Sequence, residues 1–196
     1  MSEKQNKIFG NFLEIKEGDM KGRLSLSFQA MTLNIDELWE GSALSAKFLS
    51  TFWGKFFPDK GNLSPHIRKR VQDEVHYISG ELMGNAVKFS YEPEYLIEIC
   101  LYLYENELRF YVTNSLNPDY EDKFQTFILR ILTEDPSELF LEQIEKSAAE
   151  ENNESGVGFL TMINDYGVTL SWKFGEKIPG IKTVTTLAQL PIIIEK

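Results

Sequence analysis

Two long stretches of the chain place apolar residues at every third or fourth position, the spacing of a helix with one buried face. The first stretch, residues 35 to 57, predicts a helix that ends before Pro58. Its expected buried stripe consists of Leu44, Phe48, Phe52 and Phe56. The second stretch, residues 64 to 89, begins with Ser64 and Pro65, a capping side chain followed by a proline that suits the first helical turn. We therefore expect two consecutive long helices.

Elsewhere, apolar and polar residues alternate with period two, as they do in half-buried strands. Residues 8 to 15 and 23 to 29 are expected to form an opening hairpin around a turn at residues 17 to 22. The other expected strands are residues 95 to 103, 108 to 113, 168 to 174 and 182 to 192, of which the first two form a central hairpin.

Between the central hairpin and the last strands, residues 119 to 153 have helical periodicity. They predict two short helices, 124 to 132 and 138 to 149, separated near Pro136. A further helix is expected after Gly158. This order of strands and helices predicts an α/β (α+β) two-layer sandwich with the helices on one face of the sheet.

The composition fits one domain with a substantial core, because the chain has 196 residues, of which 42% are hydrophobic and 13% aromatic. No repeat or linker divides it, so we expect a single domain over residues 1 to 196. The formal net charge of -10 at pH 7 argues against a nucleic-acid partner, because neutralising phosphates needs clustered Lys and Arg. The dense basic run from Arg68 to Arg70 is interpreted as a solvated helical turn or as a patch for a partner.

The sequence also favours a soluble cytoplasmic protein. A single cysteine, Cys100, cannot form an internal disulfide, and its alternating apolar neighbours predict that it is buried in a sheet. No apolar run reaches the roughly 18 residues that cross a membrane, and residues 1 to 7 lack the apolar core of a secretory signal. His66 and His76 are isolated from cysteine, so a zinc site has little support.

A polar stripe lies on the second predicted helix. Glu81, Asn85 and Lys88 are four and three residues apart and therefore share one face of the helix. The amide oxygen of Asn85 suits Mg²⁺, which takes only one or two protein ligands, and Lys88 suits a phosphate. Glu81 is placed to orient an attacking hydroxyl or water in phosphoryl transfer. The competing interpretation is an ordinary solvated helix face.

A glycine turn precedes the last predicted helix. A helix that begins directly after Gly156 and Gly158 presents free backbone amides and the positive end of its dipole, which together bind phosphate. Ser155 and Thr161 either add hydroxyl contacts to such a ligand or cap the helix. The alternative interpretation is a plain turn.

These two motifs resemble those of the GHKL ATPases. Glu81-x-x-x-Asn85-Ala followed by a basic residue is similar to their N box, and the segment from Ser155 to Leu160 is similar to their later glycine box. The chain as a whole is similar to a bacterial group of stand-alone GHKL-type regulators that is common in cyanobacteria, and to the anti-sigma-factor serine kinases.

This resemblance implies a fold, a cofactor and a partner. The fold is the Bergerat type of sandwich, with a mixed sheet and a helical lid over the nucleotide at about residues 119 to 154. The cofactor is Mg-ATP, with Asn85 on the metal and Lys88, Ser155 and the glycine turn on the phosphates. The partner is a small regulatory protein, and a homodimer is also implied. The charge and the lack of a long apolar run, rather than the resemblance, argue against nucleic acid and membrane partners.

One family motif is absent. The resemblance requires Asp-x-Gly-x-Gly after a strand, where this chain has Asn114-Ser-Leu-Asn-Pro118. Asn114 keeps a carbonyl oxygen that accepts the adenine amino proton, but without charge. The missing glycines also restrict how closely the backbone approaches a ligand. Adenine binding is therefore expected to be weakened or altered.

Two functions follow from these observations and remain open. The first is a Ser/Thr protein kinase that phosphorylates a small partner in a partner-switching pathway, with Glu81 as the catalytic residue. A histidine kinase is disfavoured because no phospho-acceptor histidine helix precedes the ATPase-like region. The second is a degenerate relative that binds a nucleotide or a partner without catalysis, which Asn114 and the missing glycines favour.

Overall fold

The computed structural model describes residues 6–29, 35–56, 65–149 and 156–192. Its strands are β1 (Lys7–Phe9), β2 (Gly22–Gln29), β3 (Leu96–Leu103), β4 (Glu107–Ser115), β5 (Thr169–Ile178) and β6 (Ile181–Pro191). Its α-helices are α1 (Ile35–Phe56), α2 (Pro65–Phe89), α3 (Glu121–Thr133), α4 (Pro136–Ala149) and α5 (Val157–Tyr166). Two 3-10 turns, η1 (Glu17–Asp19) and η3 (Pro118–Tyr120), precede β2 and α3. The predicted helices, central hairpin and closing strands are confirmed. The predicted cap at Ser64, the end of the first helix at residue 57 and the end of the predicted insertion, residues 150 to 154, lie outside the described residues.

The strands of the described chain form one sheet in the order β1-β5-β6-β4-β3-β2, and every neighbouring pair is antiparallel. The prediction of a mixed sheet is therefore wrong. The hairpins β3–β4 and β5–β6 each supply an antiparallel pair, and β4 pairs with β6 along its whole length. The two hairpins thus join into one continuous antiparallel surface.

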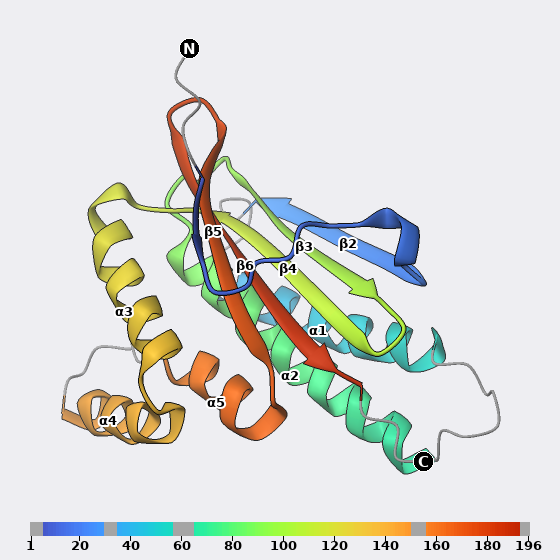
Figure 1. Cartoon of the computed structure of the whole chain (residues 1–196). Coiled ribbons are helices and arrows are strands. Elements are labelled where there is room, and N and C mark those ends of the chain that lie inside the picture. The colour runs from blue at the N-terminus through green and yellow to red at the C-terminus, as the bar shows by residue number, and fades with distance from the viewer. Residues whose placement is uncertain (1–5, 30–34, 57–64, 150–155, 193–196) are drawn as a thin grey trace.

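The predicted opening hairpin is also wrong, because β1 and β2 lie at opposite edges of the sheet. β1 ends after three residues, and Gly10, at a φ of +73°, turns the chain. Residues 10–21 then cross the outer face of the sheet, in front of the strands in Figure 1. Phe12 and Leu13 pack on a cluster of buried tyrosines there, and the Tyr111 hydroxyl donates to the Leu13 carbonyl at 2.8 Å. The apolar residues that predicted a paired strand therefore cover the sheet instead.

Helices α1 and α2 cover the opposite face of the sheet and lie behind it in Figure 1. The main hydrophobic cluster contains residues from these helices and from the strands above them. Its largest fully buried side chains include Trp53, Ile78, Phe110 and Trp172. The predicted sandwich, with helices on one face of a sheet, agrees with this arrangement.

The buried face of α1 differs in part from the predicted stripe: Phe52 packs against the core, whereas Leu44 and Phe48 are exposed, and the side chain of Phe56 lies outside the described residues. Leu44 is 68% exposed and Phe48 is 52% exposed, whereas Ala46, Leu49 and Trp53 are buried. Both sets have helical spacing, so periodicity alone does not choose between them. Trp53 decides the orientation, because its ring packs under Gly22 of β2, 3.1 Å from where a Cβ on that glycine would lie.

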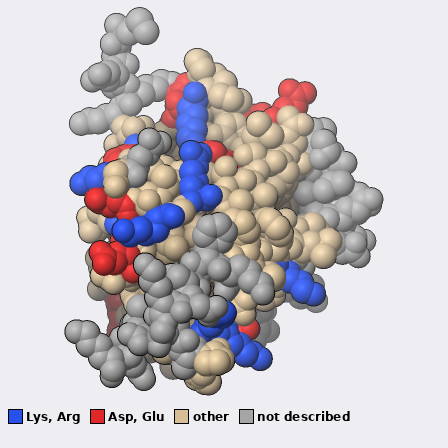
Figure 2. All heavy atoms as spheres, turned by 90° about the vertical axis from the view of Figure 1, so that its right-hand side faces the viewer, with Lys and Arg blue, Asp and Glu red and all other residues tan. Residues whose placement is uncertain are grey.

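Two smaller predictions concern single positions on the sheet and on α2. Cys100 is buried in β3, in the tyrosine cluster of the outer face, as predicted. The basic run from Arg68 to Arg70 lies in α2, and Arg70 forms an ion pair with Glu74 at 3.5 Å. On the face seen in Figure 2, Lys and Arg side chains form a narrow band and small groups beside a broad uncharged area. Among the described helices, none combines the length and the apolar character that crossing a membrane requires.

Candidate functional site

A cavity of about 1250 Å³ opens between α2, the end of β4, α3, α4 and the start of α5. Ligand sites in proteins usually measure roughly 300 to 1000 Å³, so this cavity has room for a nucleoside triphosphate. The predicted site residues that line it are Glu81, Asn85, Lys88, Asn114, Gly156 and Gly158. The structure therefore brings the polar stripe of α2 and the glycine turn before α5 to one cavity.

The polar stripe of α2 faces the cavity because the opposite side of the helix is buried. Ile78, Leu82 and Ala86 are buried against the sheet. Glu81 and Asn85 are consequently half-buried at the cavity wall, and Lys88 is exposed in the last turn. A cation in that position complements the negative end of the helix dipole.

The carboxylate of Glu81 packs directly against the first turn of α5. A Cβ added to Gly158 would lie 2.1 Å from Glu81 Oε2, so any larger residue there would force this side chain to move. Burial raises the pKa of Glu81 above its ordinary value. The carboxylate thus lies at the helix N-terminus, where the backbone amides of α5 have no partners within the helix.

Gly156 caps α5 in the left-handed conformation, with a φ of +59°. A Cβ at this position would lie 2.3 Å from Cζ of Phe127, a residue of α3. Gly156 is therefore required twice, once by the backbone angle and once by the close approach of α3. Through this contact, α3 lies against the Gly156–Gly158 turn, the candidate phosphate-binding turn.

Thr161 of α5 and Ser155 were also predicted as site residues. Thr161 is not among the residues that line the cavity, and its side chain interacts with Tyr77 on α2. The Tyr77 ring stacks on Tyr166 with centroids 4.9 Å apart, so this side of α5 packs against α2. Ser155 lies outside the described residues.

Asn114 lies near the end of β4 and is only 6% exposed. Its Nδ2 donates a hydrogen bond to the carbonyl of Ser115 at 2.8 Å, which orients the amide within the cavity wall. The buried Ser115 Oγ in turn accepts hydrogen bonds from the backbone amides of Tyr91 and Glu92, at 3.0 and 2.8 Å. In place of a glycine loop, the end of β4 is therefore tied to the segment after α2.

Sequence reasoning missed the cations that the two-helix insertion contributes. Lys123 and Arg130 of α3 and Lys146 of α4 line the cavity, together with Lys88. Among the described residues of the lining, Glu81 is the only carboxylate. The spacing of Lys123, Phe127 and Arg130, four and three residues apart, was a usable signal, because it puts all three on one face of a helix. The cavity lining of this acidic protein is thus predominantly basic and suits an anion.

The described residues include no group of three or more His, Cys, Asp or Glu side chains that could hold a metal ion. A protein site for Mg²⁺ does not require such a group, because the ion keeps several waters and takes the rest of its ligands from phosphates. The amide oxygen of Asn85 could therefore serve as the single protein ligand of a Mg²⁺ ion.

The chain is similar to known proteins in fold but not in sequence. No protein-family model matches the chain, and no curated protein matches its sequence. Among solved structures, the fold is similar to that of a chain in the SiaB–SiaC complex from Pseudomonas aeruginosa, with a TM-score of 0.52 and 14% sequence identity. The match covers 85% of this chain and 89% of that chain. At this identity the likeness establishes a shared fold.

Proposed function

We propose that this protein is a cytoplasmic signalling regulator whose cavity binds Mg-ATP and that it transfers phosphate to a Ser or Thr of a small partner protein. The observation that carries the proposal is the convergence of Glu81, Asn85 and the Gly156–Gly158 turn on one basic cavity. Segments far apart in the sequence supply these groups, so a solvated helix face does not account for their convergence.

Each residue has a role that its chemistry suits. Asn85 offers a neutral oxygen to Mg²⁺, and Lys88 meets a phosphate as a point charge. The amides of the first turn of α5 hold phosphate oxygens. Glu81, whose pKa is raised by burial, orients the hydroxyl of the partner and accepts its proton as phosphate is transferred. Bound Mg-ATP would supply the phosphoryl group and leave as ADP, and the metal ion would neutralise the charge that develops.

The partner in this proposal is a small regulatory protein. Two observations support that choice: the sequence resembles the anti-sigma-factor serine kinases, and the similar structure is a complex of two proteins, SiaB and SiaC. The cations that line the cavity suit a phosphate-rich ligand, so we place the partner at the cavity mouth.

A second function, binding without catalysis, is favoured by the base end of the cavity. Asn114 is neutral and β4 continues to Ser115 without a glycine loop, so the part of the site that would hold adenine differs from that of the enzymes it resembles. Such a protein would switch its partner by binding a nucleotide rather than by turning it over.

Phosphate transfer separates the two functions. The natural chain and the Glu81→Gln variant are each incubated with γ-labelled Mg-ATP and an extract of the source cells. The kinase proposal expects label on Ser or Thr of one small protein with the natural chain and a loss of about 100-fold or more with Glu81→Gln. Equal labelling with both chains contradicts the role of Glu81. Nucleotide binding by both chains with no labelled protein supports the binding module.

A further inference from the structure

Arg130 on α3 is held by two carboxylates. Its Nε donates to Glu134 Oε1 at 2.7 Å and its Nη2 donates to Glu134 Oε2 at 2.8 Å. Its Nη1 and Nη2 also donate to the two oxygens of Glu142 on α4, at 3.1 and 2.6 Å. Lys146, one turn further along α4, donates to Glu142 as well. These ion pairs link the two helices of the insertion.

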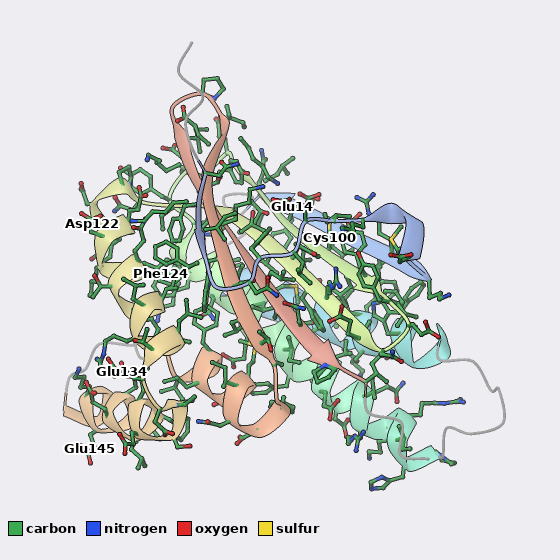
Figure 3. All side chains as sticks on the ribbon, in the orientation of Figure 1. Glu14, Cys100, Asp122, Phe124, Glu134 and Glu145 are labelled. Carbon is green, nitrogen blue, oxygen red and sulfur yellow. The ribbon has the colours of Figure 1, made fainter. Side chains whose placement is uncertain are left out.

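The cations of this network line the cavity, whereas its carboxylates do not. Arg130 and Lys146 belong to the cavity wall, and Glu134 and Glu142 are absent from it. Glu134 lies at the end of α3, next to α4, in Figure 3. Glu142 therefore binds both cations, and Glu134 binds Arg130, from outside the cavity lining.

The position of Arg130 relative to α5 follows from the helix repeat. Phe127, three residues earlier on the same face of α3, packs against Gly156 at the start of α5. Arg130 thus belongs to the α3 face that covers the N-terminus of α5, where the free backbone amides lie. Cationic side chains and helix amides on one side of a cavity are two independent features that favour an anion.

We propose that Arg130 and Lys146 bind the terminal phosphate of a nucleoside triphosphate, and that Glu134 and Glu142 occupy these cations when no triphosphate is present. The inference rests on the proposed function and specifies its ligand. A guanidinium binds carboxylate and phosphate with the same planar fork, so Arg130 can exchange a carboxylate oxygen for a phosphate oxygen by turning its side chain toward the cavity. A diphosphate lacks the group that reaches these cations.

This exchange connects the ligand to the insertion. Because Glu142 bridges α4 to Arg130, a phosphate that takes over Arg130 also weakens the link between α3 and α4. Triphosphate and diphosphate would therefore leave the two helices differently attached, at the mouth of the cavity where we place the partner.

The test compares the affinities of Mg-ATP and Mg-ADP for the whole chain by calorimetry. Arg130→Gln is expected to weaken Mg-ATP binding by about tenfold or more, the size of a lost charge-assisted hydrogen bond, and Mg-ADP binding by much less. Glu142→Gln keeps both cations and removes the carboxylate that they share, while Glu134 stays on Arg130, so it is expected to strengthen Mg-ATP binding severalfold. Glu145→Gln is the matched control. It removes the same charge from α4, but Glu145 lies on the exposed side of that helix (Figure 3).

The outcomes are distinct. If the natural chain binds Mg-ATP and neither Arg130→Gln nor Glu142→Gln changes the ratio of the ATP and ADP affinities, this inference is wrong and the proposed function stands. If Glu145→Gln strengthens Mg-ATP binding as much as Glu142→Gln does, general charge explains the effect and the inference also fails. If the natural chain binds no Mg-ATP, both proposals fall.

Discussion

At the scale of single residues, the candidate site depends on two glycines that make room for side chains from other helices. Gly158 leaves space for the Glu81 carboxylate, and Gly156 leaves space for the Phe127 ring. The sequence predicted both glycines as a phosphate-binding turn, from their position before a helix. It did not predict which side chains lie against them, because those contacts depend on how α2 and α3 pack.

Gly156→Ala tests the contact with Phe127. The substitution forces a side chain into the left-handed region and pushes its Cβ into Phe127, so we expect a loss of about 2 to 4 kcal/mol in the free energy of unfolding. Gly167→Ala is a matched control, because Gly167 has a φ of +64° and nothing within 4 Å of its Cβ position. It should cost only about 1 kcal/mol. Urea unfolding measures both, and equal losses would show that the Phe127 contact is unimportant.

Glu81 gives a prediction about pH. Burial raises the pKa of its carboxyl in the folded protein, so the folded state favours the protonated form. The contribution of Glu81 to stability is therefore greatest below the pKa of the unfolded chain and falls as the pH rises through the folded pKa. Glu81→Gln, which stays neutral, is expected to be more stable than the natural protein at pH 7, with the difference vanishing near pH 4. Urea unfolding at both pH values checks this, and a loss of stability at pH 7 would refute it.

At the scale of elements, periodicity predicted nearly every helix and strand but not every buried face. In α1, two apolar sets share the helical repeat, and the packing of Trp53 under β2 buries the set containing Leu49. In residues 10–21, alternating apolar residues predicted a strand, yet Phe12 and Leu13 cover tyrosines on the sheet. The periodicity of apolar residues predicts which residues share one face of a helix or strand. It does not predict which other element covers that face.

Two substitutions on α1 test its assigned orientation. Leu49 is fully buried, so Leu49→Ala is expected to lower the free energy of unfolding by about 2 to 5 kcal/mol. Leu44 is 68% exposed, so Leu44→Ala should change it by no more than about 0.5 kcal/mol. Chemical denaturation of both variants decides the matter. A larger loss from Leu44→Ala would restore the stripe that the sequence predicted.

At the scale of the whole molecule, the fold brings together groups that no local motif connects. The sequence predicted Glu81, Asn85, Lys88 and the glycine turn, and the structure places them on one cavity. Arg130 and Lys146 were missed, because their spacing on short helices also fits an ordinary charged surface. The order of the strands was missed as well, since a strand pattern does not name its neighbour and β1 and β2 pair with distant strands.

The central claim is that the cavity shared by α2 and α5 binds a magnesium nucleotide, and calorimetry with Mg-ATP on the whole chain tests it most directly. The natural protein should bind, Asn85→Ala should bind about tenfold or more weakly, and Thr161→Val should bind normally because Thr161 does not line the cavity. Added Mg-ATP should also raise the unfolding temperature of the natural protein, since a ligand of the folded state stabilises it. No heat and no stabilisation with the natural chain, or unchanged binding by Asn85→Ala, would contradict the account.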